Sequence, residues 1–462
     1  MSLDVAPRQE PAPPASVPFR AALVVWCRVA ALSFGGPAGQ IAVMQRILVD
    51  EKRWVSQRRF LHALNYCMLL PGPEAQQLAI YLAWLLNGTW AGIVAGTLFV
   101  LPGFLSILGL SVLYASFQGT SFVAALFYGL KPAVVAVVAE ALLRVGRRAL
   151  RGRAQVAIAG LAFVAIFFFN LPFPLILVLA GTTGWLLGRQ GRAGFGGSGL
   201  ELGEEGDERI ADAAARHRGA SQRLPSWKRS LAVAATWLSL WWIPIGLLAL
   251  ALGRGSVVVQ EGVFFSQTAV VTVGGAYSVL SYIAQRAVGD FHWLSAREML
   301  DGLGLAETTP GPLIQVVQFV AFLGAYRRPG ALSPLLSGML GSLLTTWATF
   351  TPCFLWIFLG APYIEWLRGR RALSDALTAI TAAVVGVILN LTVWFSLHTL
   401  FGEVRQMALG PARLWIPEWR TLDPVALLIA IASAWALLRA RAGLLATLAA
   451  ATAAGMLWQW LR

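Results

Sequence analysis

The sequence predicts an all-α polytopic membrane protein built from two inverted-topology repeats, and three observations support this fold class. Of the 462 residues, 57% are hydrophobic and only 13% are charged, too little charge to cover a soluble protein of this size. Apolar stretches long enough to cross or re-enter a bilayer follow one another along the chain. The tripeptide Pro-Gly-Pro interrupts two of them, at residues 71–73 and 310–312.

About thirteen apolar segments are expected to form transmembrane or re-entrant helices. Residues 1–20 are proline-rich and lack a signal-peptide pattern, so they predict a disordered tail. Residues 189–229 are rich in glycine and in charges of both signs, which predicts a linker between two halves. The segments are 21–43, 60–86, 89–116, 121–143, 154–170, 172–188, 230–252, 263–284, 297–324, 331–360, 373–400, 424–440 and 442–461.

The two halves repeat one another. A shift of 239 residues places Ser56 on Ser295 and the first Pro-Gly-Pro on the second. Pro102 matches Pro352 at a shift of 250, so the second half carries an insertion of about 11 residues, 250 minus 239. The predicted domains are a first transporter repeat at 21–188, a second at 230–401 and a C-terminal helical hairpin at 402–462.

Arginine-rich loops indicate that the second repeat is inverted. Residues 144–153 are rich in Arg, whereas the equivalent residues 394–403 carry no Lys or Arg. Residues 368–371 are basic, and their counterparts at 118–121 are not. The positive-inside rule then places the N-terminus and the linker in the cytoplasm. Residues 45–59 carry five basic residues yet fall outside in a simple count, so the first segment is alternatively a re-entrant hairpin.

The two Pro-Gly-Pro breaks predict an anion site. Proline in a helix interior costs about 3 kcal/mol, and a broken helix at membrane depth must be buried in protein or line a wet cavity. A helix starting at Pro73 or Pro312 would point free N–H groups and a positive dipole end into the interior. Thr308 and Thr309 are expected to cap the second of these helices. Alternatively, the prolines are kinks that only shape packing.

A second repeated element holds a double glycine, in SFGGPAGQ at 33–40 and TVGGAYSV at 272–279. Double glycine permits close approach of a ligand or of another helix, and both uses stay open. The substrate-binding candidates from the two elements are Ser33, Gly35, Gly36, Gln40, Pro71, Gly72, Pro73, Gln77, Thr272, Gly274, Gly275, Thr309, Pro310, Gly311, Pro312 and Gln315.

Ionisable residues inside apolar segments are few and are costly unless paired or functional. Arg28 and Lys131 are candidates to supply fixed positive charge to a bound anion, because neither has a charged counterpart in the second half. Alternatively, each snorkels to the interface or pairs with Glu140. The candidates for proton coupling are Glu74, Glu140 and Glu307, since a buried carboxylate can load and release a proton.

The remaining composition excludes several other classes of function. The net charge of +14 comes from Arg residues at segment ends, as topology signals and lipid contacts require, so no nucleic-acid partner is expected. Cys27, Cys67 and Cys353 lack metal-ligand spacing and are predicted to be reduced core residues. The sequence has no metal-spaced His cluster, P-loop or nucleophile elbow, so we expect no enzyme, metal or cofactor.

In order along the chain, SFGGP, KRWVS and LLPGPEAQQLA, then VGGAYSVL, HWLS and TTPGPLIQ resemble the chromate transporter (CHR) family in its long, two-domain form. The resemblance covers about residues 17–401. It implies a bacterial inner-membrane protein that exports chromate by antiport, driven by the proton-motive force, gives chromate resistance, and binds sulfate as a competitor. Ala276 stands where the first half has Pro37, and Leu313 where it has Glu74, so the halves need not contribute equally.

Two alternatives stay open from the sequence. One is an importer of sulfate or another oxyanion, because coupling and not sequence sets the direction of transport. The other is a membrane anion sensor or scaffold that does not transport. The lipid bilayer is the surrounding partner in each case, and a homodimer is compatible with a protein of this size, although no pattern specifies one.

Overall fold

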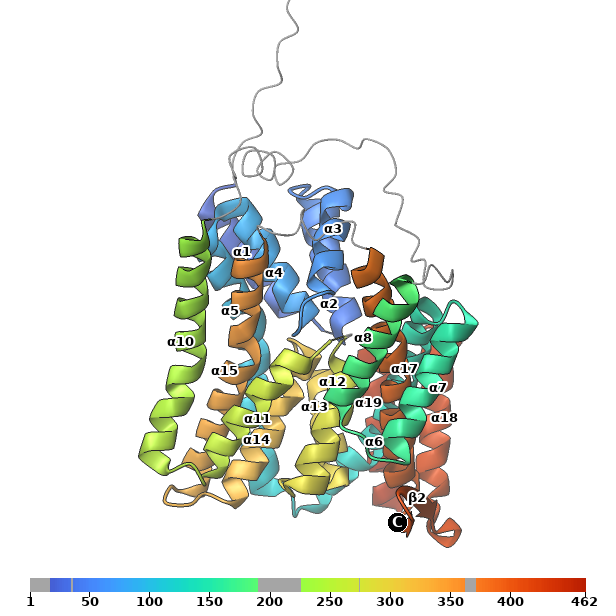
Figure 1. Cartoon of the computed structure of the whole chain (residues 1–462). Coiled ribbons are helices and arrows are strands. Elements are labelled where there is room, and N and C mark those ends of the chain that lie inside the picture. The colour runs from blue at the N-terminus through green and yellow to red at the C-terminus, as the bar shows by residue number, and fades with distance from the viewer. Residues whose placement is uncertain (1–16, 35, 190–225, 274, 362–370) are drawn as a thin grey trace, which may run out of the picture.

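The structure is a computed structural model that describes residues 17–34, 36–189, 226–273, 275–361 and 371–462 (Figure 1). The described residues are almost entirely helical, which confirms the predicted all-α class. Within these ranges, six helices are long and apolar enough to cross a membrane, and shorter apolar helices accompany them. The basic loop at 368–370 and most of the predicted tail and linker lie outside the described residues.

The helices of the first half follow the predicted segments closely. They are α1 (Phe19–Leu32), α2 (Gly36–Gln45), the π-helix η1 (Arg46–Glu51), α3 (Gln57–Cys67), α4 (Glu74–Asn87), α5 (Thr89–Phe117), α6 (Ser121–Ala149), α7 (Arg153–Phe167) and α8 (Phe173–Arg189).

The second half begins with an additional span, α10 (Trp227–Leu252), and then repeats the order of the first. Its elements are α11 (Val257–Val271), α12 (Ala276–Ala284), the π-helix η2 (Gln285–Asp290), α13 (Ala296–Thr308), η3 (Leu313–Gln315), α14 (Val316–Arg327), α15 (Pro334–Gly360), α17 (Arg371–Leu400), the strands β1 (Val404–Leu409) and β2 (Ala412–Pro417), η5 (Trp419–Thr421), α18 (Pro424–Leu438) and α19 (Leu444–Leu461).

Equivalent residues form equivalent local structures in the two halves. The six-residue π-helices η1 and η2 start at Arg46 and Gln285, a shift of 239 residues. Ser56 and Ser295 cap α3 and α13, and each hydroxyl accepts a hydrogen bond from the backbone N–H three residues later. In Figure 1, α1 to α4 lie in the upper part of the molecule and α11 to α14 in the lower part, the arrangement that inverted repeats give.

The last helices of each repeat pack on the other repeat. α7 and α8 lie along α17, whereas α18 and α19 lie along α6. The start of α18 follows that of α7 by 271 residues, and α19 follows α8 by the same shift. α18 and α19 are therefore the structural counterparts of α7 and α8, and each repeat is held by helices of the other.

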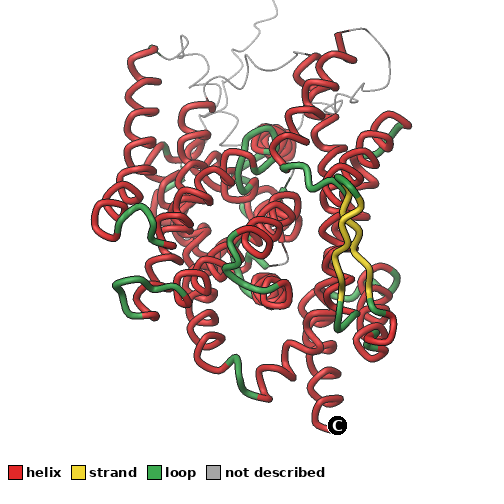
Figure 2. The backbone as a smooth tube through the Cα atoms, turned by 60° about the horizontal axis from the view of Figure 1, so that its bottom comes forward, coloured by secondary structure: helices red, strands yellow, loops and turns green. Residues whose placement is uncertain are grey.

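A β-hairpin precedes α18 and lies outside the predicted apolar segments 424–440 and 442–461, which form α18 and α19. β1 and β2 pair antiparallel, with Leu409 opposite Ala412 (Figure 2). Gly410 and Pro411 form the turn, and Gly410 has the positive φ of 61° that favours glycine. A two-residue turn with Gly at its first position is a hairpin signal, and it determines the structure of this short insertion.

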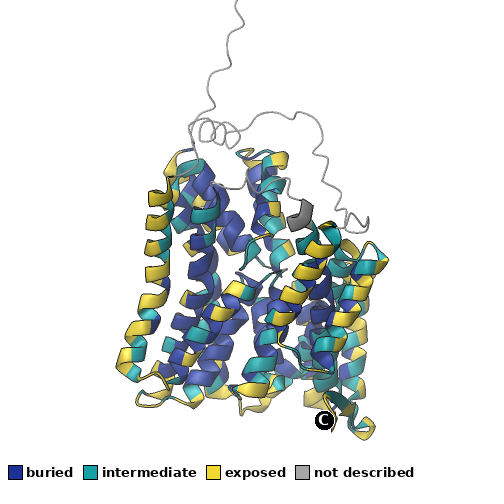
Figure 3. Cartoon of the chain, viewed as in Figure 1, coloured by how far each residue is buried: buried dark blue, intermediate teal, exposed yellow. Residues whose placement is uncertain are grey.

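The outer surface of the bundle is apolar. Exposed residues cover the length of α10 and the outward faces of neighbouring helices (Figure 3). On α10 the exposed side chains include Leu231, Leu247 and Leu250, the last 86% exposed. Apolar exposure on this scale fits contact with lipid. Cys27 is also exposed, on α1, so its predicted core position is wrong, whereas Cys67 and Cys353 are buried as expected.

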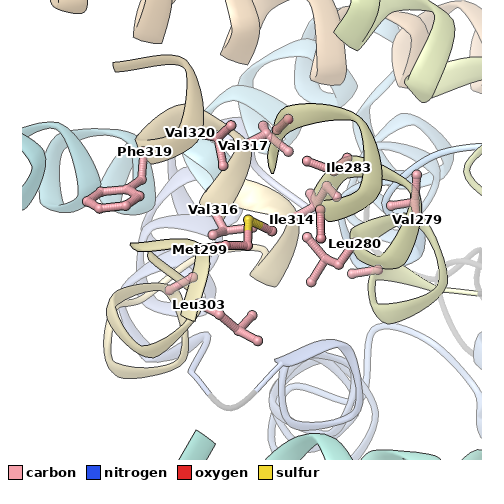
Figure 4. Packing of buried hydrophobic residues seen from close by; sticks show 14 of the residues in the cluster. Val279, Leu280, Ile283, Met299, Leu303, Ile314, Val316, Val317, Phe319 and Val320 are labelled. Carbon is pink, nitrogen blue, oxygen red and sulfur yellow. The ribbon is translucent and has the colours of Figure 1, made fainter. Parts of the chain in front are cut away.

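The broken helices of the second half are packed in the core. Figure 4 shows one cluster of apolar side chains from α12, α13 and the η3–α14 segment. Leu280, Met299, Val316 and Phe319 in this cluster are all fully buried. Close packing of this kind holds the break between α13 and η3 in a fixed position.

We predict that Gly386→Val in α17 destabilises the fold, because a Cβ atom at Gly386 would meet the carbonyl oxygen of Ala159 in α7. A backbone carbonyl cannot change rotamer to relieve the clash, so overpacking by the valine side chain should lower the free energy of unfolding by about 1–3 kcal/mol. The melting temperature of the detergent-purified protein measures this effect. Gly160→Val is the matched control, because nothing lies within 4 Å of a Cβ atom there. Equal melting of the two variants would contradict the packing of α7 on α17.

Candidate functional site

Each Pro-Gly-Pro break is joined to the double-glycine loop of the other repeat. The backbone N–H of Gly72 donates to the carbonyl of Thr272 at 2.8 Å. The N–H of Gly311 donates to the carbonyl of Ser33, also at 2.8 Å. The two pairs are related by the 239-residue shift, so the four loops form one reciprocal crossing. We call it the central crossing.

Glycine makes this close approach possible. Gly36, Gly72, Gly275 and Gly311 all have positive φ, from 68° to 116°. A side chain at any of these positions would be strained. Gly103 of α5 packs directly on the second break, since a Cβ atom there would meet the carbonyl oxygen of Pro310. The candidates Gly35 and Gly274 lie outside the described residues.

The breaks start new helices as predicted. α4 begins directly after Pro73 and η3 after Pro312, and no side chain caps either start. Thr308 and Thr309 do not cap η3, so that prediction is wrong. Their hydroxyls instead donate to the carbonyls of Leu305 and Ala306 in α13, because both threonines lie at the C-terminal end of that helix.

Three candidate glutamines lie at or beside the breaks, and two of them hydrogen-bond the break residues. Gln40 donates its side-chain amide to the carbonyl of Gly311. Gln77 donates to the carbonyl of Pro71 at 2.7 Å, and Gln315 donates to Gln318 at 2.7 Å. All three are buried, with at most 1% of their surface exposed. The amides of Gln40 and Gln77 therefore stabilise the crossing, whereas that of Gln315 bonds α14.

Beside the central crossing lies a cavity of about 300 Å³, here called the Glu307 pocket. Glu140 and Arg144 of α6 line it and form an ion pair. Glu307, at the end of α13, lines it too and accepts a hydrogen bond from the Tyr277 hydroxyl at 2.5 Å. Arg441, between α18 and α19, is also part of the wall. Two of the three predicted carboxylates therefore meet in one pocket.

The Glu307 pocket contains a carboxylate oxygen without a hydrogen-bond partner among the described residues. The second carboxylate oxygen of Glu307 is buried, and no described group hydrogen-bonds it. Gly36 lines the same pocket, and a Cβ atom there would lie 3.9 Å from the Tyr277 hydroxyl. The double-glycine loop therefore leaves space for a small ligand next to Tyr277, in a site that holds two guanidinium groups and two carboxylates.

Lys131 lies in a different cavity of about 450 Å³, here called the Lys131 pocket. Its ammonium is 3.1 Å from a carboxylate oxygen of Asp301, whose other oxygen accepts a hydrogen bond from Tyr114 at 2.8 Å. The side chain of Asp301 is only 5% exposed and that of Lys131 is 21% exposed. The alternative pairing of Lys131 with Glu140 is therefore wrong, because Asp301 holds the lysine.

The structure does not bring Arg28 to either pocket. Arg28 is exposed on α1 and pairs with Glu51 of η1 at 2.6 Å. The alternative that it pairs with Glu140 is therefore wrong. Glu74 is half-buried at the start of α4 and lines neither pocket. Arg28 and Lys131 thus occupy separate environments.

Arg144, Asp301 and Tyr277 belong to the two pockets but are not among the candidates predicted from the sequence. Arg144 was assigned to a basic cytoplasmic loop, although its position four residues after Glu140 is the spacing of a helical ion pair. Asp301 lies in the predicted apolar segment 297–324, before the second break, and an acidic residue there is a signal by itself. Tyr277 gives no sequence signal, because its role depends on the folding of α12 against α13.

Comparison with known proteins matches the chain twice to one family. The family described as Chromate transporter matches residues 21–185 and 259–456, which cover α1 to α8 and α11 to α19. A chromate transport protein of Pseudomonas aeruginosa is 30% identical over 361 residues, 77% of this chain and 76% of that relative. A chromate transport protein of Cupriavidus metallidurans is 26% identical over 373 residues, 80% of each.

A shorter relative matches one repeat. The uncharacterized transporter YwrB of Bacillus subtilis is 29% identical over 154 residues, which are 33% of this chain and 77% of that relative. A protein little longer than one repeat therefore exists beside the doubled chain. No solved structure matches this chain.

We predict that Lys131 and Asp301 are energetically coupled. Lys131→Met leaves a buried carboxylate without a cation and should destabilise the protein, whereas Lys131→Met/Asp301→Asn should recover most of the loss. A double-mutant cycle on melting in detergent should give a coupling of about 1–3 kcal/mol.

Arg286 and Asp290 provide the matched control, because their side chains are 39% and 44% exposed. Their coupling should be near zero in the same cycle. Additive effects of Lys131→Met and Asp301→Asn would show that the buried pair is absent.

Proposed function

The chain belongs to the chromate transporter family, and we propose that it exports chromate from the cytoplasm, driven by the proton-motive force. Membership in the family and the apolar helices make it a multi-pass membrane protein with a role in chromate transport. We place it in the bacterial inner membrane, with the N-terminus and the linker in the cytoplasm. Export from there would confer chromate resistance.

The Glu307 pocket is the binding site that we propose for chromate. Chromate is a tetrahedral dianion with oxygen acceptors only, and guanidinium groups bind such oxyanions with several N–H donors. Arg144 and Arg441 line the pocket and supply two positive charges. The side chain of Arg144 is 40% exposed and lines this pocket, so it can exchange one partner for another. Sulfate has the same charge and shape and should compete.

Glu140 acts in this proposal as the resting partner of Arg144. An arriving dianion takes the place of the Glu140 carboxylate, and the ion pair re-forms after release. Protonation of Glu140 or Glu307 removes a negative charge from the pocket, so protons and chromate strengthen each other's binding. Such positive linkage does not by itself exchange a proton for an anion.

The drive for export is therefore assigned to the electrical part of the proton-motive force rather than to proton antiport. A membrane potential acts on each elementary charge with about 2.3 kcal/mol per 100 mV. For a dianion the sum is about 4.6 kcal/mol per 100 mV, directed out of a cell with a negative interior. This energy is enough to sustain a chromate gradient without coupled proton exchange.

We predict that respiring inverted membrane vesicles containing this protein accumulate chromate. Collapse of the membrane potential with valinomycin and K⁺ should abolish the accumulation, whereas nigericin, which removes the pH gradient, should leave it. Arg144→Gln should reduce uptake at least about tenfold, because loss of one charge-assisted pair costs about 1.5–3 kcal/mol. Filter-trapped radioactive chromate is the readout.

Arg147→Gln is the matched control, because Arg147 is an exposed arginine one turn further along α6 that does not line the pocket. It should transport as the wild type does. Loss of accumulation with nigericin would show that proton exchange drives export. If wild-type vesicles accumulate nothing, the protein is an importer or an anion sensor and the proposal is wrong.

A further inference from the structure

The Glu307 pocket and the Lys131 pocket lie at opposite ends of the same helices. α18 contributes Ala426, near its start, to the Lys131 pocket and Leu437, near its end, to the Glu307 pocket. On α6, Lys131 and Arg144 are 13 residues apart, 144 minus 131. At about 1.5 Å per residue their backbones are separated by about 20 Å. The two pockets thus lie at the two ends of the interface between α6 and α13, here called the α6–α13 seam.

The seam between α6 and α13 carries charge into both pockets. α6 supplies the cation in each case, Lys131 in one pocket and Arg144 in the other. α13 supplies Asp301 to the first and Glu307 to the second. Each pocket is therefore lined by a cation from α6 and a carboxylate from α13.

An apolar constriction separates the two ends. Gly304 of α13 lies between Asp301 and Glu307, and a Cβ atom there would come within 2.7 Å of the Leu130 side chain of α6. It would also lie 3.4 Å from Val134. Leu130 and Val134 are buried, with 3% and 0% of their surface exposed. The two helices are therefore in close apolar contact at this point, between the two pockets.

We propose that the Lys131 pocket is a second binding station for the dianion, at the far end of a path along the α6–α13 seam. This inference rests on the proposed chromate transport and adds where the anion is held after it passes the constriction. When the ammonium of Lys131 turns to the anion, Asp301 keeps the hydrogen bond from Tyr114. The buried carboxylate therefore retains a donor during the exchange.

The other carboxylates of the Lys131 pocket are engaged elsewhere. Glu298 is held by Arg327, and both oxygens of Asp423 accept the hydroxyl of Tyr128. Arg297 is exposed and adds a second positive charge to the wall. Two cations, Lys131 and Arg297, therefore line the pocket. Lys131 must leave Asp301 to bind an anion, as Arg144 must leave Glu140 in the Glu307 pocket.

Protection of engineered cysteines tests the second station. In a Cys27→Ser background, Ala124→Cys reports on the Lys131 pocket and Ala442→Cys on the Glu307 pocket, because both alanines are exposed and line those cavities. The protein is placed in nanodiscs, where both faces are open, and labelled with a charged maleimide. Sulfate is the probe, since it is a dianion that does not oxidise thiols, and chloride at equal ionic strength is the control.

Sulfate should slow labelling severalfold at both cysteines. Lys131→Met/Asp301→Asn, the pair predicted above to keep its stability, should abolish protection at Ala124→Cys and retain it at Ala442→Cys. Retained protection at Ala442→Cys also shows that the variant is folded. Protection confined to Ala442→Cys in the otherwise unchanged protein would overturn the second station and leave the proposed function standing. Protection at neither cysteine would contradict both.

Discussion

The structure depends on one constraint, that backbone groups freed by a break in a membrane helix must find partners inside the protein. Here each break is satisfied by the opposite repeat: Gly72 donates to Thr272, and Gly311 donates to Ser33. Each repeat therefore contributes a hydrogen-bond acceptor to the break of the other. The same exchange recurs at the outer helices, where α7 and α8 pack on α17 while α18 and α19 pack on α6. The two repeats therefore contact each other both at the central crossing and through their outer helices.

The chemistry carried by this symmetric scaffold is asymmetric. Lys131 and Glu140 of α6 correspond, at a shift of 250, to Thr381 and Asn390 of α17. Asn390 is used structurally, because its amide donates to Ser281 at 2.8 Å. Charged groups therefore gather along the α6–α13 seam. A single charged seam fits one path per chain, with the second repeat providing the acidic face through α13. The two repeats together form the helical scaffold. The charged residues of the pockets come from positions at which the two repeats differ.

The sequence predicted what depends on local chemistry and on repetition. Proline and glycine at the two breaks, and the equal spacing of both halves, predicted helix starts after Pro73 and Pro312 that the structure confirms. It could not predict partners chosen by packing. Asp301 meets Lys131 across 170 residues of chain, 301 minus 131, and no spacing rule links them. The place of Arg144 in the pocket could not be predicted either. A basic residue near a helix end has the pattern of a topology signal, and only the fold shows that it lines a pocket.

The central claim is that chromate binds Arg144 in competition with the protein's own Glu140 carboxylate. The most direct test is the equilibrium dissociation constant of chromate for Glu140→Gln and for the wild type in nanodiscs, at one alkaline pH and one ionic strength. If the carboxylate competes, Glu140→Gln should bind chromate about tenfold more tightly, which corresponds to about 1.4 kcal/mol. Unchanged or weaker binding would show that Glu140 supports the site instead of competing for it, and would contradict the account.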